Sequence, residues 1–485
     1  QGGFQEVEQM NLFKDMVCYQ EEVRDPSRMA EVLNRVIEKA IRGSAPAQIN
    51  VPRDYWTQVV DIELPPIVRL ERQGGGADAI SKAAKLLSEA KFPVILSGAG
   101  VVIGGAIEDC KKLAEKLDSP VCSGYQHNDS FPGSHPLAAG PLGYNGSKAA
   151  MQLISKADVV LALGTRLNPF STLPGYGLDY WPNEAKIIQV DMNSDRIGLT
   201  KKVTVGICGD AKLVSQQILE KLSSKAGDQG REERKNLIHQ TKSAWLQTLT
   251  SLDHEEDDPG TVWNKEARER DNNRMSPRQA WRAIQAGMPE DVIISSDIGN
   301  NCAIGNAYPT FEKGRKYLAP GLFGPCGYGF PSILGAKIGC PDTPVIGFAG
   351  DGAFGISMNE MSSCARKEWP NITMVIFRNY QWGAEKRNSI LWFEDNFVGT
   401  ELDPELSYAK VANACGLNGV AVKTMEETTK AIKQSCEDQK KGITTFIEVI
   451  LNQELGEPFR RDAMKKPVKV SGINKADMKP QKPLN

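Results

Sequence analysis

Two oxygen-bearing side chains, Asp351 and Asn379, stand just after apolar runs in the last third of the chain. The run 344–349 (PVIGFA) precedes the first, and the run 372–377 (ITMVIF) precedes the second. Between them, the pattern of 358–368 indicates a helix. Strand, helix and strand in this order predict a crossover between two parallel strands. Both side chains are then expected at the carboxyl edge of a sheet, where open α/β sheets bind their ligands.

The residue types at this edge suit a hard cation and a phosphate group. Asp351 offers a carboxylate oxygen and Asn379 an amide oxygen, which Mg²⁺ accepts as ligands together with water and phosphate. Gly350 and Gly352 would let the backbone approach a phosphate closely. Alone, Gly-Asp-Gly could be only a tight turn and Asn379 a loop residue. Their placement at strand ends and the 26 residues between the two motifs (353–378) favour a cofactor site.

A second strand end is expected at the same edge. The segment 291–295 (DVIIS) has the pattern of a strand and leads into Gly299, Asn300 and Asn301. Small and amide residues at such a place can donate hydrogen bonds to diphosphate oxygens. The alternative is an Asx-type turn that only caps the next helix.

The composition excludes several classes of protein. The chain has 485 residues, a formal net charge of −2 and 40% hydrophobic residues, which argues against a strongly basic nucleic-acid or membrane-surface protein. No apolar run is long enough to span a bilayer. The ten cysteines lack CxxC spacing, which indicates reduced thiols of a cytoplasmic protein. The four histidines form no HxxxH pair, so a zinc site is not expected.

Residues 1–62 hold too few elements to close a core. They contain one strong helical pattern, 26–42, with Asp25 as its N-cap and Gly43 at its end, followed by a strand-like run at 46–51. We therefore expect only part of a domain here.

The rest of the chain is expected to form two doubly wound domains. Residues 76–225 alternate strand and helix patterns. In the turn that contains Gly98 and Gly100, the third glycine falls at 104, whereas a dinucleotide fingerprint needs it at Ile103. A structural role for this turn is therefore favoured over nucleotide binding. Ser276, with a proline and a glutamine after it, predicts a capped helix that runs to residue 286.

The spacing of Gly-Asp-Gly and Asn379 resembles that of the thiamine diphosphate enzymes, and the resemblance covers essentially the whole chain. The segments 348–360, 377–402 and 451–467 are similar to the sulfoacetaldehyde acetyltransferase branch of that family. The resemblance implies thiamine diphosphate and Mg²⁺ as cofactors. It implies Asp351, Asn379 and the main-chain carbonyl of Gln381 as the metal ligands.

The resemblance to thiamine diphosphate enzymes implies three doubly wound parallel-sheet α/β domains, with the first one incomplete. The expected division is 1–62 for the end of the pyrimidine-binding domain, 63–75 for a linker, 76–225 for a central Rossmann-like domain, 226–275 for a charged linker, 276–455 for the diphosphate- and Mg²⁺-binding domain, and 456–485 for a basic tail.

The resemblance also implies the residues that contact the cofactor. These are Gly299, Asn300, Asn301, Gly324, Cys326, Gly350, Gly352, Ala353 and Gly383. Relatives often place methionine at the position of Cys326 to support the bent cofactor, and cysteine is smaller. A redox or nucleophilic role for Cys326 is not expected, because nothing near it in the sequence lowers its pKa.

The implied activity converts sulfoacetaldehyde and phosphate into acetyl phosphate and sulfite in a homo-oligomer, a dimer or a dimer of dimers. Both substrates are small anions, so Lys386, Arg387, Arg460 and Arg461 are candidate contacts. For each of these cations the alternative is an ordinary solvated surface position.

The activating glutamate of the family has no match in this chain, because it is expected before residue 1. This leaves two other interpretations open. One is acetolactate synthase or a related 2-oxoacid decarboxylase, and the other is a non-catalytic, cofactor-binding fragment.

Overall fold

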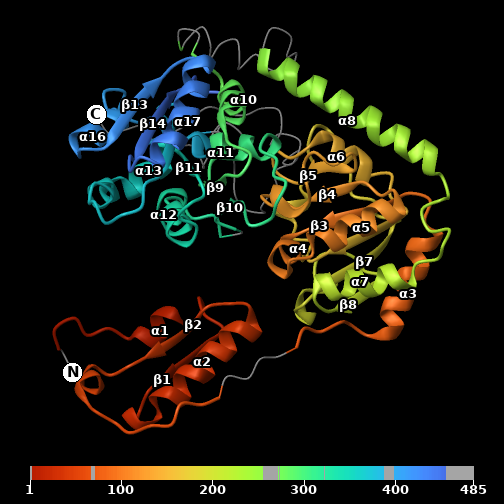
Figure 1. Ribbon diagram of the computed structural model, residues 1–485, viewed down its shortest axis with the longest axis horizontal. Helices are drawn as coiled ribbons and strands as arrows, with labels where there is room; N and C mark the ends of the chain where they lie inside the picture. Colours follow the sequence, from red (N-terminus) through yellow and green to blue (C-terminus); the bar gives the residue numbers. More distant parts are fainter. Residues whose placement is uncertain are drawn as a thin grey trace, which may run out of the picture. The chain divides into compact units, whose positions relative to one another are not determined.

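The computed structural model describes residues 3–66, 71–254, 271, 274–321, 323–386 and 398–454 (Figure 1). The chain divides into two compact units, Gln1–Arg72 and Gln73–Asn485. The division falls inside the segment 63–75. Each unit is described by itself below.

The first unit is a small parallel α/β assembly. Its elements are α1 (Gln9–Phe13), β1 (Tyr19–Glu22), η1 (Pro26–Arg28), α2 (Met29–Gly43), β2 (Ala47–Asn50) and η2 (Arg53–Thr57). Strands β1 and β2 pair in parallel, and α2 buries Val32 and Val36 against Val23. A two-stranded sheet with one covering helix agrees with the expectation of an incomplete first domain.

The predicted helix in this unit is present, but its end differs from the prediction. Asp25 accepts a hydrogen bond from the backbone N–H of Ser27, as expected of an N-cap. At the other end, α2 continues through Gly43 and the left-handed residue is Ser44, with φ 46°. A Cβ at Gly43 would lie 3.1 Å from Cys18 Sγ, so this glycine relieves a close contact and does not form the turn.

The second unit begins with a six-stranded parallel sheet in the order β5-β4-β3-β6-β7-β8 (Figure 1). Its elements are α3 (Ala77–Glu89), β3 (Pro93–Ser97), α4 (Ala99–Gly104), α5 (Ile107–Leu117), β4 (Val121–Ser123), η3 (Asn128–Ser130), β5 (Ala138–Pro141), α6 (Lys148–Ile154), β6 (Val159–Leu163), η4 (Phe170–Thr172), β7 (Lys186–Asp191), η5 (Ser194–Arg196), β8 (Val205–Cys208) and α7 (Ala211–Lys221). This is the doubly wound arrangement that the alternating pattern predicted.

The glycine turn after β3 packs against the loop after β6. A Cβ at Gly98 would lie 2.6 Å from the carbonyl oxygen of Gly164, and one at Gly100 would lie 2.6 Å from the Gly164 Cα. The absence of side chains is therefore required by two loops in close contact, which supports the structural interpretation of this turn.

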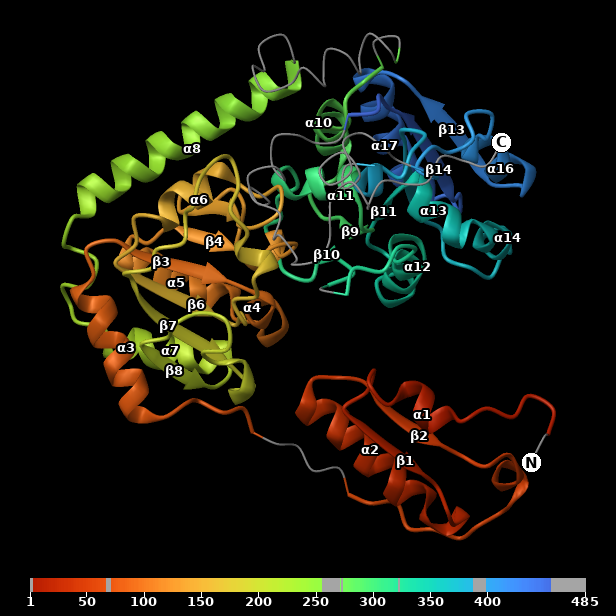
Figure 2. The same ribbon diagram turned by 180° about the vertical axis from the view of Figure 1, so that it is seen from behind.

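The expectation of a solvated linker over 226–275 is wrong for much of its length. Helix α8 (Arg231–His254) occupies it and packs against α6, as Figures 1 and 2 show. Ile238, Trp245 and Leu249 of α8 are buried. The charged runs 255–258 and 265–274, which favoured a solvated linker, lie mostly outside the described residues. In the part of the chain that the structure describes, no helix is both long and apolar enough to cross a membrane.

Arg234 anchors the start of α8. Its side chain is 1% exposed. Its guanidinium donates to the main-chain carbonyls of Lys91, Leu117, Asp118, Gly227 and Gln229. All five N–H groups are thus used, which is how a buried arginine avoids the cost of an unsatisfied charge.

A second six-stranded parallel sheet follows, in the order β10-β9-β11-β12-β14-β13. Its elements are α10 (Pro277–Gly287), β9 (Ile293–Ser296), α11 (Asn300–Ile304), η6 (Gly305–Ala307), β10 (Tyr317–Leu318), α12 (Gly329–Gly339), β11 (Val345–Gly350), α13 (Asp351–Ser357), η7 (Met358–Glu360), α14 (Met361–Cys364), β12 (Thr373–Arg378), α16 (Tyr408–Ala414), β13 (Asn418–Val422), α17 (Met425–Gln439) and β14 (Thr445–Ile450). The predicted capping box of α10, with Ser276 and Gln279, is confirmed.

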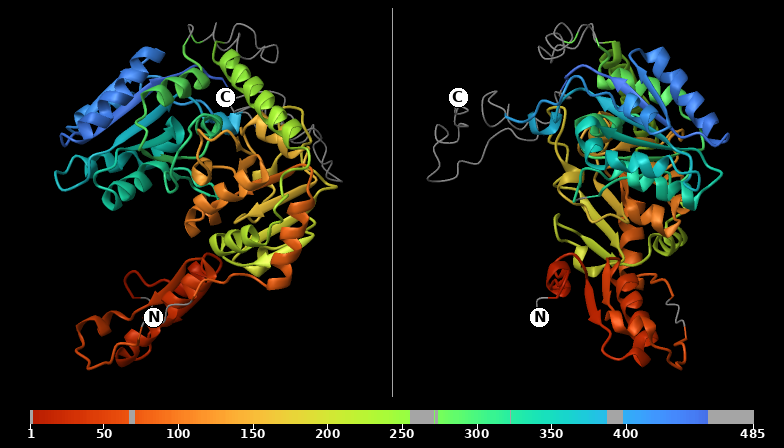
Figure 3. Two further views of the ribbon diagram at one scale, coloured as in Figure 1. Left: turned by 45° about the vertical axis from the view of Figure 1, so that its right-hand side comes forward. Right: turned by 90° about the vertical axis from the view of Figure 1, so that its left-hand side faces the viewer.

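Both faces of this sheet are buried, because alternate residues of each strand enter different apolar clusters. Phe348 and Phe377 pack with Trp281 of α10, whereas Ala349 and Ile376 pack on the side of α12 and α13. Figure 3 shows helices over both faces. A sheet covered on both faces leaves its strand ends as the place where polar groups can gather.

The helix between β11 and β12 starts earlier than predicted. The sequence pattern placed it at 358–368, but α13 begins at Asp351 itself, with Gly350 as its N-cap, and α14 ends at Cys364. The glycines at 350, 352 and 355 hid this first part, since glycine weakens any helical pattern. Asp351 is therefore held on the first turn of a helix as well as at a strand end.

Candidate functional site

The predicted crossover is confirmed, and it brings Asp351 and Asn379 together. Strands β11 and β12 pair in parallel with Gly350 opposite Phe377, so their carboxyl ends are adjacent. Strand β9 ends on the other side of β11, where Ser296 pairs with Phe348. The three loops that follow these strands carry most of the candidate residues.

The Asp351 carboxylate is buried and held at both oxygens. The side chain is 1% exposed. Oδ2 accepts hydrogen bonds from the backbone N–H of Tyr380 at 2.6 Å and from Arg378 Nη1 at 3.1 Å. Oδ1 accepts one from the backbone N–H of Gly352 at 3.0 Å. This leaves capacity for a further partner on Oδ1, the oxygen that faces Asn379.

Three groups converge beside this oxygen. The terminal amide atom of Asn379 that faces Asp351 Oδ1 lies 3.2 Å from it and 3.2 Å from the carbonyl oxygen of Gln381. With nitrogen in this place, the amide donates two hydrogen bonds. With oxygen in this place, a carboxylate, an amide and a main-chain carbonyl present three oxygens to one point. That is the donor set of a Mg²⁺ site that leaves its other positions to phosphate and water, so the residues fit the ion.

The pKa of Asp351 is raised to about 6 because the carboxylate is buried, although the charge of Arg378 and the backbone N–H groups of Tyr380 and Gly352 act in the opposite direction. The carboxylate is thus ionised at neutral pH, but with a smaller margin than an exposed aspartate.

Cation binding at Asp351 is expected to weaken as the pH falls through about 6. Because a cation needs the ionised carboxylate, a proton competes with it, and the apparent Kd for Mg²⁺ should rise by up to about tenfold per pH unit below the pKa. Calorimetric titration with Mg²⁺ and thiamine diphosphate over this range measures the effect. Titration of thiamine diphosphate with Mg²⁺ in the absence of protein is the control, since only the phosphate groups then titrate. The same pH dependence with and without protein would contradict the expectation.

The glycines of the Gly-Asp-Gly motif have different surroundings. A Cβ at Gly350 would meet nothing within 4 Å, whereas one at Gly352 would lie 2.7 Å from the ring of Trp382. The indole thus occupies the space where a side chain at 352 would lie, which by itself requires glycine there. The close approach of a phosphate to the backbone of Gly350 and Gly352 stays a prediction. Ala353, next in α13, is 4% exposed.

Gly383 lies among the side-chain amides of the site. A Cβ there would be 3.6 Å from the amide nitrogens of Asn300, Asn379 and Gln381. These are ordinary contact distances, so packing alone does not require glycine at this position. The structure thus gathers candidate residues from the loops after β9 and β12 around one point.

Asn300 and Asn301 lie on the first turn of α11, after Gly299 as N-cap, and their side chains do not form a cap. The Asx-type alternative is therefore wrong. Asn300 Oδ1 accepts a hydrogen bond from the Tyr144 hydroxyl at 3.1 Å. The carbonyl oxygen of Asn301 accepts one from Trp281 Nε1 at 2.6 Å. Both asparagines are 5% exposed or less and so are held in place at the sheet edge.

The glycine-rich segment before α12 is tied to the sheet edge by Asp297. Its carboxylate accepts hydrogen bonds from the backbone N–H groups of Ile298 at 2.8 Å, Gly327 at 3.1 Å and Gly329 at 2.7 Å. Gly324, with φ 61°, has a left-handed conformation that other residues rarely adopt. Sequence reasoning did not single out Asp297, although an acidic residue directly after a strand is the same signal that marked Asp351.

Cys326 has no features of a reactive thiol. It is exposed, and its pKa is raised by partial burial and by the Asp297 and Glu385 carboxylates. A raised pKa lowers the thiolate fraction at neutral pH. This agrees with the expectation that it is not a nucleophile.

Lys386 forms an ion pair with Glu401 that the sequence did not indicate. It is 7% exposed and lies 3.5 Å from Gln453 Oε1. Glu401 comes close because the chain returns to pair with 380–382, where the Trp382 N–H donates to the Thr400 carbonyl at 2.7 Å. Arg387, Arg460 and Arg461 lie outside the described residues.

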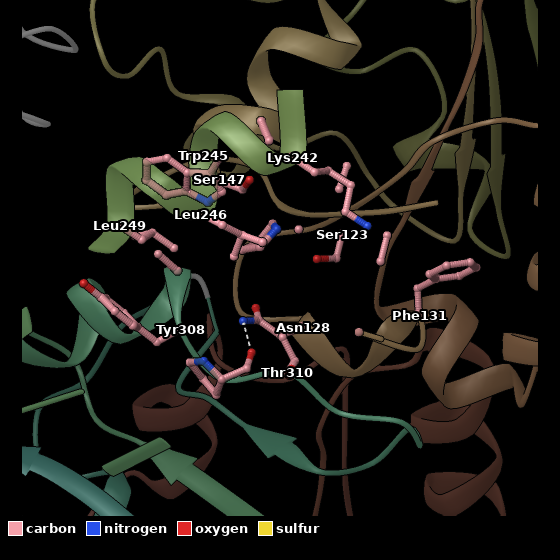
Figure 4. Close-up of a pocket in the computed structure, with 18 of the residues that line it drawn as sticks. Ser123, Asn128, Phe131, Ser147, Lys242, Trp245, Leu246, Leu249, Tyr308 and Thr310 are labelled. Carbon is pink, nitrogen blue, oxygen red and sulfur yellow. Dashed lines mark hydrogen bonds between the residues drawn. The ribbon is translucent and has the colours of Figure 1, made fainter. Parts of the chain in front are cut away.

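A cavity of about 360 Å³ lies elsewhere, between β4 and β5 of the central sheet, α8, α10 and the segment 307–310 (Figure 4). Trp245 and Leu249 of α8 line it, with Asn128 and Tyr308 on the facing loops. No candidate site residue contributes to its wall. The candidate site is therefore identified by its strand ends and donor groups and not by the size of a cavity.

Comparison with family models agrees with this location. Residues 80–221 match the central domain of thiamine pyrophosphate enzymes. Residues 297–449 match the C-terminal TPP binding domain of these enzymes. The second match includes all three proposed metal ligands.

Comparison with curated proteins finds relatives along nearly the whole chain. The chain is 76% identical over 482 residues to a probable sulfoacetaldehyde acetyltransferase of Rhizobium meliloti (strain 1021). The aligned region covers 99% of this chain and 82% of that protein. The chain is 73% identical to a sulfoacetaldehyde acetyltransferase of Roseovarius nubinhibens, covering 99% and 80%. A probable acetolactate synthase large subunit of Methanococcus aeolicus is 28% identical over 445 residues, covering 89% and 72%.

Proposed function

The chain belongs to the sulfoacetaldehyde acetyltransferases of the thiamine pyrophosphate enzyme family, and on that premise we propose that it converts sulfoacetaldehyde and phosphate into acetyl phosphate and sulfite. The observation that carries the proposal is the 76% identity over 99% of this chain to a relative of that name. The alternative, acetolactate synthase, is supported by only 28% identity to the probable acetolactate synthase large subunit of Methanococcus aeolicus.

The reaction balances without an external oxidant. The aldehyde carbon becomes an acyl carbon as the neighbouring carbon loses its bond to sulfur, so one carbon is oxidised while the other is reduced. The aldehyde hydrogen leaves as a proton, sulfite leaves with the electron pair of the carbon–sulfur bond, and the carbon that carried sulfur gains a proton to become the methyl group. Phosphate oxygen then forms the new bond to the acyl carbon. Thiamine diphosphate, when bound, supplies the reactive carbon that this rearrangement needs.

The protein groups described above would bind and orient that cofactor. Asp351, Asn379 and the Gln381 carbonyl would hold Mg²⁺, whose charge offsets that of the diphosphate. Asn300 and Asn301, at the same edge, would donate hydrogen bonds to phosphate oxygens.

Other parts of the proposal extend beyond the described residues. Arg387, Arg460 and Arg461 are proposed to contact the sulfonate or phosphate, since a guanidinium can bind either with two N–H groups. A homo-oligomer, a dimer or a dimer of dimers, is proposed from the family. A cytoplasmic location is proposed because all ten cysteines are free thiols.

The test is sulfite release from sulfoacetaldehyde, measured with and without phosphate on protein expressed from the complete coding sequence. We expect release that depends on both Mg²⁺ and thiamine diphosphate, with acetyl phosphate appearing in equal amount only when phosphate is present. A flavin spectrum together with turnover of a 2-oxoacid would favour acetolactate synthase. Cofactor binding without turnover of either substrate would favour a non-catalytic role.

The two C-terminal arginines can be tested in the same assay. Arg460→Ala or Arg461→Ala is expected to raise the apparent KM for one anion by roughly tenfold or more, since a lost charge-assisted hydrogen bond costs about 1.5–3 kcal/mol. The cofactor Kd should not change. Normal kinetics for both anions in both variants would place the anion site elsewhere.

A further inference from the structure

Arg378 is a buried cation that contacts Asp351, one of the proposed metal ligands. It is the last residue of β12, directly precedes Asn379, and its side chain is fully buried. It lies on the face of the sheet that carries Met374 and Ile376, which belong to an apolar cluster. A charge in such a place costs free energy unless its partners are held in good geometry.

Its partners come from three parts of the chain. Nη1 donates to Asp351 Oδ2 at 3.1 Å, and Nε lies 3.6 Å from Glu448 Oε1. Nη2 donates to the carbonyl oxygens of Asp403 and Leu406, the latter at 3.0 Å. One guanidinium thus joins the proposed metal ligand, strand β14 and the segment before α16.

Further contacts hold the partners of Arg378. Glu448 Oε2 accepts hydrogen bonds from Ser407 Oγ at 2.6 Å and from the backbone N–H of Ala409 at 3.1 Å. The guanidinium carbon lies 4.2 Å from the ring centre of Tyr380 and 5.4 Å from that of Tyr408. The Tyr408 hydroxyl in turn donates to the carbonyl oxygen of Asp351 at 2.9 Å. Arg378 is therefore fixed by its surroundings, and it can fix Asp351 in turn.

We propose that Arg378 is a positioning residue of the metal site, which holds Oδ2 of Asp351 so that Oδ1 faces the oxygens of Asn379 and Gln381. The role rests on the proposed function, because it needs a cation at that place. A buried ion pair is weak evidence for stability by itself, since an apolar side chain of similar size would fill the space at no larger cost. The distinctive effect of this pair is the orientation of one carboxylate, as partners of metal ligands commonly provide.

The test is Arg378→Lys, which keeps the charge but cannot contact Asp351, Glu448 and two carbonyls at once. With thiamine diphosphate at saturation, calorimetry with Mn²⁺ as the probe should show a Kd that is about ten- to a hundredfold higher than in the wild type. The assay measures binding and needs no turnover.

Arg234→Lys is the matched control. It makes the same change in another buried arginine that donates to main-chain carbonyls, but in α8. It should lower the melting temperature and leave the Kd for Mn²⁺ unchanged. If Arg378→Lys also lowers only the melting temperature, the positioning role is wrong and Arg378 is a structural residue.

Glu448→Gln decides the question if Arg378→Lys does not fold. The amide oxygen can still accept from Ser407 and Ala409, but Asp351 becomes the sole buried counter-charge that faces Arg378 among the described residues. Without the Glu448 charge the guanidinium is held less firmly, and it then positions Oδ2 of Asp351 less firmly. The Kd for Mn²⁺ should therefore rise, and an unchanged Kd would overturn the proposal. If the wild-type protein binds no Mn²⁺ at all, the metal site of the proposed function is wrong as well, which separates the two failures.

Discussion

Replacing Asp351 with alanine is expected to abolish Mg²⁺-dependent binding of thiamine diphosphate. Asp351 offers the only carboxylate among the three proposed ligands, and neither Asn379 nor the Gln381 carbonyl carries a charge that could replace it. Without that charge the cation is held too weakly to offset the diphosphate, and binding should weaken by about a hundredfold or more. Calorimetry with and without Mg²⁺ measures this loss.

The fold must be checked separately, because Asp351→Ala also leaves Arg378 without one partner. Breaking a buried pair costs about 3–5 kcal/mol. Glu448 still faces Arg378 after this change, so the observed cost should fall toward the lower end. Asp351→Asn is the control, since it keeps an oxygen for Arg378 and removes only the charge. Wild-type cofactor affinity in Asp351→Ala, with the protein folded, would show that the metal site is wrong.

Replacing Trp281 with alanine is expected to lower the free energy of unfolding by about 3–5 kcal/mol. The indole is fully buried, with ring centres 4.7 Å from Phe348 and 5.3 Å from Phe377. It also fills the space at Gly305, where a Cβ would lie 2.2 Å from the ring. Alanine would leave a cavity at the centre of this cluster and remove the hydrogen bond to the Asn301 carbonyl.

Urea unfolding measures this change, and two variants serve as controls. Trp281→Phe keeps most of the ring volume but not the N–H, and should cost about 1–3 kcal/mol for the unpaired carbonyl. Trp56→Ala makes the same substitution at a side chain that is 71% exposed, and its effect should be small. Similar losses in Trp56→Ala and Trp281→Ala would contradict the role of Trp281 in the core.

The strands of the third domain were predictable because their signal is local. Apolar runs bounded by glycine and proline predict buried strands, and the crossover rule then predicts that they are parallel. From this it follows that Asp351 and Asn379 meet at one edge, as the structure has them. The start of the helix between β11 and β12 was predicted wrongly. Gly350 and Gly352 weaken the helical pattern of α13, so the sequence indicated a start at 358.

Helix α8 was not predicted because its signal is weak in the sequence and strong only in context. Its apolar residues are few, and what buries them is α6 and the third domain, which are distant in sequence. A charged segment of this kind resembles a solvated linker until its packing partners are known.

The sequence by itself determined which residue types reach the sheet edge, since the periodicity of strands and helices depends on neighbours along the chain. Only the tertiary structure decided what surrounds those residues. It placed the Trp382 ring in the space at Gly352, Glu401 against Lys386, and Glu448 behind Arg378. These contacts join strands and loops that are up to 70 residues apart (Arg378 and Glu448), and no local pattern encodes them. They are set by the packing of both faces of the sheet, and that packing decides which oxygen of Asp351 faces Asn379.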